Sequence, residues 1–220
     1  MGERLIAIGD IHGCFDQLRA LVEEQIRIKK SDRLVLLGDY IDRGYKIRQV
    51  TDYIIDLMEK GFDVIPLIGN HEAMMLDAIE NADRLSGWFM NGGHETLYSF
   101  GIDSPDKLDN RYLDFFRNLR YYHMQDQFIF VHAGFNDEIE DPLTDRYHML
   151  WSRRETYSNP FFRGKTIIHG HTPIQLSACR EKIASGTRFI NIDTGCVYSE
   201  LDGLGHLTAI ELFTRELFSV

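Results

Sequence analysis

The sequence contains no apolar run that approaches the ~18 residues of a membrane-spanning helix, and its first residues do not form the apolar core of a signal peptide. We therefore expect a cytoplasmic protein that does not insert into membranes. Only three of the 220 residues are cysteines, and Cys14, Cys179 and Cys196 stand far apart, so no disulfide framework is indicated. Because no repeat, biased segment or linker interrupts the chain, we expect one domain over residues 1–220.

An excess of positive charge is also missing. The 24 lysines and arginines are outnumbered by 34 aspartates and glutamates, which gives a net charge of −10. This balance argues against nucleic acid and anionic membranes as partners, because both attract basic surfaces. It leaves room for a phosphate-bearing substrate, since a bound metal ion can outweigh a distant net charge.

Short apolar runs alternate with amphipathic helices in the first third of the chain. Strands are predicted at residues 4–8, 34–37 and 64–68, with helices over 15–26 and 50–58 between them. This order predicts a βαβαβ unit with parallel strands. Pro66 indicates that the third strand lies at an edge or contains a bulge. After a helical middle section, further strands are predicted at residues 128–131, 166–168, 188–192 and 207–212.

Five of the apolar runs end in Asp, Asn or His beside glycine. In open α/β sheets, ligands bind where strands end, so these side chains are expected to converge on one site. Carboxylate, amide and imidazole groups without a thiolate suit Mn²⁺, Fe or Zn²⁺. Six such groups suit two ions about 3.5–4 Å apart, with one bridging carboxylate. The six candidates are Asp10, His12, Asp39, Asn70, His132 and His171.

Each of these features has an ordinary interpretation when it stands alone. The stretch 38–44, with Asp39, Asp42 and Arg43, is as compatible with a polar loop as with a ligand site. A single histidine is more often a satisfied polar residue than a metal ligand. Coincidence is a poor explanation once six ligand types follow strands in the same way.

These residues resemble a known family. The Asp-x-His of residues 9–13, the Gly-Asp-x-x-Asp-Arg-Gly of residues 38–44 and the Gly-Asn-His-Glu of residues 69–72 look like the three-part signature of the calcineurin-like metallophosphoesterases. Within that superfamily the match is to the phosphoprotein phosphatases, above all the compact bacterial and bacteriophage members such as lambda phosphatase. The resemblance runs from Ile6 to about Gly195. It implies an α/β fold in which two mixed β-sheets pack face to face with helices outside.

The resemblance also implies roles for the six ligands. Asp10, His12 and Asp39 would hold one metal ion, and Asp39 would bridge to a second. That second ion would also be held by Asn70, His132 and His171. Two divalent ions are implied, Mn²⁺ first, with Fe or Zn²⁺ as alternatives.

Four further residues gain roles in the same way. Arg43 and Arg153 resemble the arginines that hold the substrate phosphate, although the sequence leaves open whether Arg153 or Arg154 points inward. His71 with Asp42 resembles the acid dyad of the family. A bridging hydroxide would attack phosphorus in line, and His71 would protonate the leaving oxygen.

The leading functional prediction is a metal-dependent phosphomonoesterase that acts on phosphoserine, phosphothreonine and phosphotyrosine in proteins, or on small phosphoesters. The alternative within the family is a hydrolase of diadenosine tetraphosphate or related dinucleotides. Asp42 favours the first, because those hydrolases often carry another residue at this position. A non-catalytic scaffold is disfavoured, since it would not need Arg43, His71 and the full ligand set. No residue pattern indicates an oligomeric state.

Overall fold

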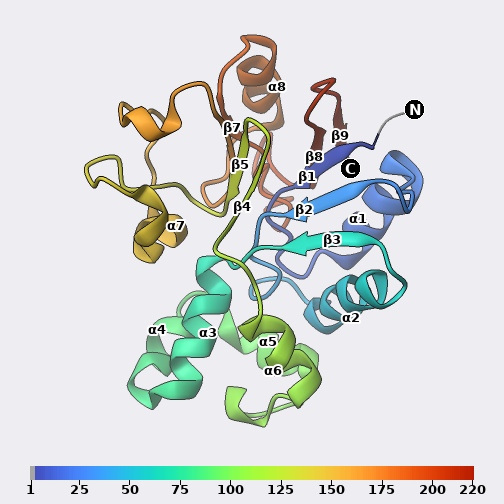
Figure 1. Cartoon of the computed structure of the whole chain (residues 1–220). Coiled ribbons are helices and arrows are strands. Elements are labelled where there is room, and N and C mark those ends of the chain that lie inside the picture. The colour runs from blue at the N-terminus through green and yellow to red at the C-terminus, as the bar shows by residue number, and fades with distance from the viewer. Residues whose placement is uncertain (1–2) are drawn as a thin grey trace.

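Strands and helices alternate along the chain in a computed structural model, which describes residues 3–220 (Figure 1). The strands are β1 Leu5–Ile8, β2 Arg33–Leu36, β3 Asp63–Pro66, β4 Tyr122–Gln125, β5 Phe128–Val131, β6 Thr166–His169, β7 Phe189–Asn191, β8 Thr208–Glu211 and β9 Leu217–Ser219. The α-helices are α1 Phe15–Ala20, α2 Ile47–Glu59, α3 Asn70–Glu80, α4 Leu85–Phe89, α5 Gly93–Phe100, α6 Asn110–Arg117, α7 Arg146–Trp151 and α8 Leu176–Ala184.

The strands form two mixed sheets, as predicted. The first has the order β3-β2-β1-β8-β9, and the second has the order β4-β5-β6-β7. β1, β2 and β3 are parallel, which confirms the predicted βαβαβ unit, and Pro66 lies in the edge strand β3. β9 was not predicted, because Leu217–Ser219 is short and only partly buried and therefore has little apolar pattern.

Side chains point alternately to the two faces of each strand, and this alternation divides the core into layers. Ile6 and Ile8 of β1 pack beneath α1 and α2, whereas Leu5 and Ala7 face the second sheet, where Phe130 of β5 meets them. Successive side chains of a strand point to opposite faces, so a buried strand supplies two layers at once. The outer face of the second sheet is covered by Met149 of α7 and by loop residues. The result is two facing sheets with helices outside.

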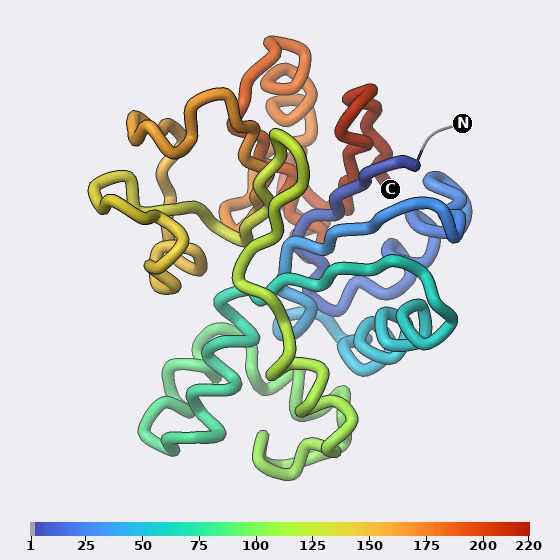
Figure 2. The backbone as a smooth tube through the Cα atoms, in the orientation of Figure 1, coloured from blue at the N-terminus to red at the C-terminus, as the bar shows by residue number. Residues whose placement is uncertain are grey.

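The helical middle section forms a separate group of helices. α3, α4, α5 and α6 gather at one end of the molecule, below the two sheets in Figure 2. The predicted helix over residues 15–26 begins as α1 but continues as a π-helix from Leu21 to Ile26, where Arg27 ends it in a left-handed conformation. Over residues 3–220, no helix combines the length and the apolar character that crossing a membrane requires.

Candidate active site

Strand ends of both sheets deliver the six predicted ligands. Asp10 and His12 follow β1, Asp39 follows β2, and Asn70 begins α3 directly after β3. The second sheet supplies the other two ligands, because His132 follows β5 and His171 follows β6. All are buried except His171, which is half-buried. The facing arrangement of the sheets therefore brings together residues that are up to 161 positions apart in the chain.

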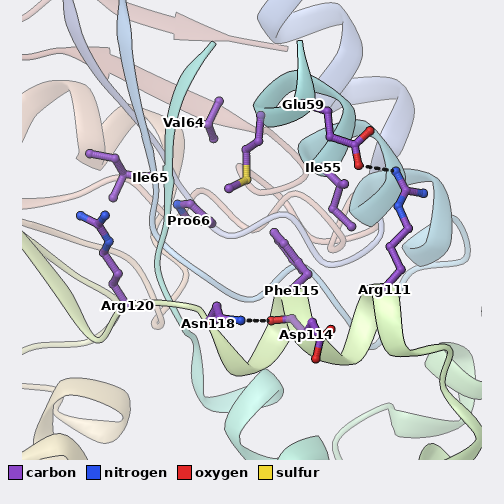
Figure 3. Close-up of a pocket in the computed structure, with 11 residues that line it drawn as sticks. Ile55, Glu59, Val64, Ile65, Pro66, Arg111, Asp114, Phe115, Asn118 and Arg120 are labelled. Carbon is purple, nitrogen blue, oxygen red and sulfur yellow. Dashed lines mark hydrogen bonds and ion pairs between the residues drawn. The ribbon is translucent and has the colours of Figure 1, made fainter. Parts of the chain in front are cut away.

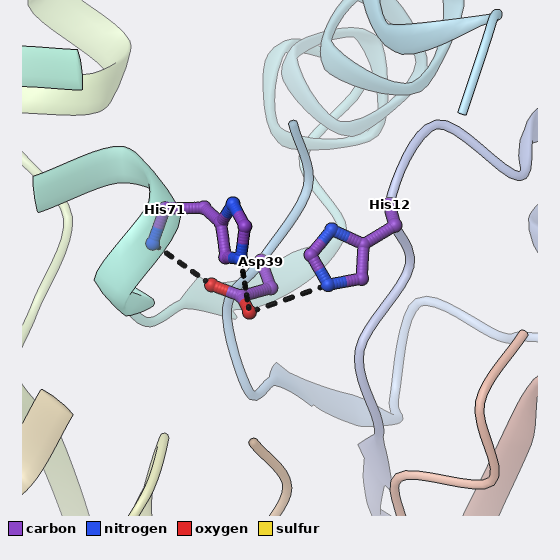
Figure 4. A group of neighbouring side chains, drawn as sticks. All are labelled: His12, Asp39 and His71. Carbon is purple, nitrogen blue, oxygen red and sulfur yellow. Dashed lines mark hydrogen bonds and ion pairs between the residues drawn. The ribbon is translucent and has the colours of Figure 1, made fainter. Parts of the chain in front are cut away.

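Asp39 lies at the centre of this group. Its Oδ2 atom is 3.4 Å from Nε2 of His12, 3.5 Å from Nε2 of His132 and 3.9 Å from Nε2 of His71. Figure 4 shows His12 and His71 approaching the carboxylate from two sides. The Asp39 carboxylate therefore lies between three imidazoles that come from separate elements.

The remaining ligands meet beside Asp39. Oδ1 of Asn70 is 2.9 Å from Nε2 of His132 and 3.0 Å from Nδ1 of His171. The backbone N–H of His171 donates to the Asp10 carboxylate at 3.0 Å. Donor atoms of Asp10, Asp39 and His132 lie within 4.8 Å of one another, as do those of His12, Asp39 and His71. Asp39 belongs to both groups, but the pairing of Asp10 with His132 and of His12 with His71 differs from the expected division of ligands.

Hydrogen bonds behind the site fix the orientation of two histidines. Nδ1 of His12 donates to the carbonyl of Ile41 at 2.8 Å, and Nδ1 of His132 donates to that of Leu37 at 2.9 Å. This leaves a lone pair on each Nε2, on the side of Asp39, which is the tautomer a metal ligand requires. Arg43 donates to Nε2 of His12 at 2.7 Å, so a cationic group already lies against that lone pair.

The buried carboxylates are stabilised by positive charge close to them. Burial raises the pKa of Asp10 well above its ordinary value, and the neighbouring Asp193 and Asp39 raise it further. Burial also acts to raise the pKa of Asp39, but the nearby His132 and His71 hold it well below the ordinary range. Clustered carboxylates with inward-facing imidazoles form a donor set that fits divalent cations.

The backbone of the site is unusual as well. Among residues 3–220, eight non-glycine residues have a positive φ, and five of them are His12, Asp39, Asp42, Arg43 and His171. Such conformations are costly and concentrate where a structure holds functional groups in place. Gly69 and Gly170 allow the close approach of the carboxylates, because a Cβ at either position would collide with Oδ1 of Asp39 or of Asp10.

A family model described as calcineurin-like phosphoesterase matches residues 3–203. The chain belongs to this family. Its members are metal-dependent phosphoesterases, so the donor set around Asp39 is the expected place for their metal ions.

The curated relatives carry two kinds of name. A symmetrical bis(5'-nucleosyl)-tetraphosphatase of Dechloromonas aromatica is 34% identical, but it aligns with 58% of this chain and 42% of its own length. An asymmetrical bis(5'-nucleosyl)-tetraphosphatase of Anoxybacillus flavithermus is 25% identical over 97% of this chain and 92% of the relative. Serine/threonine-protein phosphatase 2 of Salmonella typhimurium is 28% identical over 86% of this chain and 85% of the relative. The chain thus spans less than half the length of the first curated relatives it matches.

A solved structure supports the fold. The crystal structure of a putative diadenosine tetraphosphatase covers 100% of this chain and 94% of its own, with a TM-score of 0.69 and 20% identity. This likeness concerns the arrangement of sheets and helices.

The arginines occupy different positions around the site. Arg43 contacts His12, as described above, and its guanidinium carbon lies 5.6 Å from the ring centre of Tyr198. Arg154 pairs with Asp137 at 3.5 Å and Glu138 at 3.4 Å, which holds it on the surface. Arg153 is exposed, and after burial and His132 its charge is among the influences that lower the pKa of His171, to about 3.

His71 and Asp42 form a buried pair. Nδ1 of His71 is 2.6 Å from Oδ2 of Asp42, and the carboxylate also accepts hydrogen bonds from Nε1 of Trp88 at 2.9 Å and from the hydroxyl of Thr96. Burial lowers the pKa of His71 to about 3 and raises that of Asp42 to about 7. The sequence does not indicate these contacts of Trp88 and Thr96, because the two residues follow no strand and lie 46 and 54 positions from Asp42.

The structure also adds Asp193 to the cluster. It is buried beside Asp10, and burial raises its pKa to about 6. The signal was present in the sequence, because Asp193-Thr194-Gly195 follows the strand β7 in the same way as the other ligand motifs. Cys14 and Cys196 are neighbours as well, despite their distance in sequence, and the contact lowers the pKa of the Cys14 thiol.

Glu72 is another residue whose role emerges only from the structure. Its buried carboxylate accepts hydrogen bonds from the backbone N–H groups of Asp39, Tyr40, Ile41 and Gly69, at 2.7 to 3.2 Å. One side chain therefore ties the loop after β2 to the start of α3. These are the two segments that carry Asp39 and Asn70.

Removing this carboxylate is expected to destabilise the fold. Glu72→Ala leaves buried N–H groups unpaired and should lower the free energy of unfolding by about 3 kcal/mol or more. Glu80→Ala, at the exposed end of the same helix, is the matched control and should change it by less than about 0.5 kcal/mol. Urea unfolding of the purified proteins measures both changes. Equal losses in the two variants would contradict this role.

A large cavity lies apart from the predicted site residues. It has a volume of about 510 Å³ between β3, α2 and α6, and its lining includes Phe115 and Arg120 (Figure 3). None of the predicted site residues lines it. The chemistry of the chain is therefore concentrated at the strand ends and not in this cavity.

Proposed function

We propose that this phosphoesterase hydrolyses dinucleoside polyphosphates such as diadenosine tetraphosphate. The observation that carries the proposal is the agreement along almost the whole chain with a relative named as an asymmetrical bis(5'-nucleosyl)-tetraphosphatase. It reverses the order of the sequence-based predictions, in which a protein phosphatase came first. The whole site, from Asp10 to His171, lies within the aligned part of the chain.

Six side chains are the proposed ligands of the metal ions. Asp10, His12, Asp39, Asn70, His132 and His171 would hold two divalent ions, with Asp39 shared between them. Such ions supply Lewis acidity and an activated water when bound. The mixed set of three oxygen donors and three imidazoles suits Mn²⁺, with Fe or Zn²⁺ as alternatives.

The side chains around the ligands carry the remaining tasks. Arg43 and Arg153 bind phosphate oxygens through charge-assisted hydrogen bonds and orient the phosphorus for in-line attack. Burial raises the pKa of Asp42 to about 7, so its carboxyl can donate a proton to Nδ1 of His71, 2.6 Å away, while Nε2–H of the neutral imidazole donates to the leaving oxygen.

A specific observation favours a second candidate, the serine/threonine protein phosphatase. The His71–Asp42 pair is buried and complete, and a proton donor matters most for a poor leaving group such as a serine alkoxide. The polyphosphate leaving group of a dinucleotide needs this help less. The Salmonella relative, which aligns with most of the chain, carries a protein phosphatase name.

A substrate comparison separates the two. With Mn²⁺-loaded protein, we expect kcat/KM for diadenosine tetraphosphate to exceed that for a phosphoserine peptide by about 100-fold. Chromatography of the products distinguishes cleavage into two identical nucleotides from cleavage into unequal ones. The Asp39→Asn variant should lose both activities, which controls for a contaminating phosphatase. A preference for the peptide would make the second candidate the function.

A further inference from the structure

We infer that the pocket beside Arg43 is a nucleoside subsite in which a purine base stacks on Tyr198. The inference rests on the proposed function and names the part of the substrate that this pocket would bind. The pocket has a volume of about 420 Å³ and lies between residues 90–95 and residues 197–198. This volume is within the range of small-molecule sites.

Arg43 joins the pocket to the ligand cluster. Its guanidinium donates to His12 at 2.7 Å and also lies 5.6 Å from the ring centre of Tyr198. A phosphate bound by Arg43 would therefore have the Tyr198 ring within the reach of one attached nucleoside. The segment on the other side of the pocket is anchored to the same centre, because Trp88 and Thr96 bind Asp42.

The turn that carries Tyr198 is held in place before any ligand binds. The backbone N–H of Tyr198 donates to the carbonyl of Gly195 at 2.8 Å, and the carbonyl of Tyr198 accepts from Leu201 at 3.0 Å. The backbone N–H of Gly205 donates to the same carbonyl of Gly195 at 3.0 Å. The residue is half-buried, so part of its surface remains open to a ligand. A preorganised aromatic ring binds a base at low entropic cost.

The opposite wall suits a purine. Met90 is 84% exposed, and its flexible thioether can pack against the second face of a base. Asn91 donates to the carbonyl of Gly87 at 2.9 Å, which fixes its amide at the rim. Glu95 also lines the pocket and offers a carboxylate to an exocyclic amino group. The aromatic ring of a phosphotyrosine has no such amino group and would leave Glu95 without a partner.

Inhibition by two product-like probes tests the subsite without requiring dinucleotide hydrolysis. Hydrolysis of p-nitrophenyl phosphate by the metal-loaded protein is inhibited with adenosine 5'-monophosphate and, separately, with ribose 5-phosphate. The two differ only in the base, so we expect the nucleotide to have an inhibition constant about 10- to 100-fold lower. In Tyr198→Ala this preference should shrink to less than about threefold, whereas Tyr198→Phe should keep it.

A control variant and a folding check separate the loss of the subsite from other effects of a substitution. Tyr147→Ala, which removes an exposed tyrosine outside the pocket, should retain the full preference, and thermal unfolding checks that each variant is folded. Equal inhibition by both probes, or a preference that survives Tyr198→Ala, would overturn the subsite, as would tighter binding of phosphotyrosine than of the nucleotide. If the preference depends on Tyr198 but diadenosine tetraphosphate is not hydrolysed, the subsite stands and the proposed function fails.

Discussion

Asp39→Asn is expected to lower kcat/KM by about 10³-fold or more and to weaken both metal positions at once. Asp39 lies within 3.9 Å of three imidazoles and belongs to both groups of donors. Metal ions supply several kcal/mol of transition-state stabilisation, and each 1.36 kcal/mol corresponds to about tenfold in rate. An amide at this position keeps the shape of the side chain but loses the charge that holds two cations together.

Asp10→Asn is the matched comparison for this prediction. Asp10 belongs to only one of the two donor groups, so its variant should lose chiefly one equivalent of metal. Metal content after gel filtration gives the stoichiometry of each protein, and turnover with added Mn²⁺ shows whether weak sites can be refilled. Full activity of the wild-type protein in excess chelator, or full metal content in Asp39→Asn, would contradict the bridging role.

His71→Asn is expected to slow hydrolysis in a manner that depends on the leaving group. General acid catalysis is worth about 10²–10⁴-fold, and a serine alkoxide requires a proton whereas a nitrophenolate leaves without one. Phosphoserine peptide hydrolysis should therefore fall by about that factor and p-nitrophenyl phosphate hydrolysis by much less. Asp42→Asn should show the same dependence more weakly, since Asp42 acts through the 2.6 Å contact with Nδ1 of His71.

Metal content decides how this result is interpreted. Nε2 of His71 lies 3.9 Å from Asp39 and in the same donor group as His12, so His71 could also serve as a ligand. Loss of one metal equivalent in His71→Asn would assign it that role. Equal losses on both substrates with unchanged metal content would indicate that His71 positions phosphate and does not donate the proton.

The protonation state of His71 is a property that the sequence does not predict. The family resemblance pairs His71 with Asp42 and gives His71 the role of proton donor to the leaving oxygen. In the structure both groups are buried, and burial is the largest influence on each, lowering the pKa of His71 to about 3. Desolvation depends on every atom packed around the pair, including Trp88 and Thr96, and no local pattern reports it.

The sequence alone determined the parallel βαβαβ unit and the six residues that converge at the strand ends, and it limited the strand with Pro66 to an edge or a bulge. These follow from local rules, because apolar runs form strands, parallel strands end on the same side, and polar residues beside glycine mark where they end. Only the tertiary structure decided which donors share a centre and that Asp193 lies beside Asp10. It also decided that Glu72 ties two loops together, that Arg154 faces away, and that Tyr198 meets Arg43 across 155 positions. Such contacts arise from the packing of one sheet, loop or helix against another, and that packing depends on many weak interactions distributed over the whole chain.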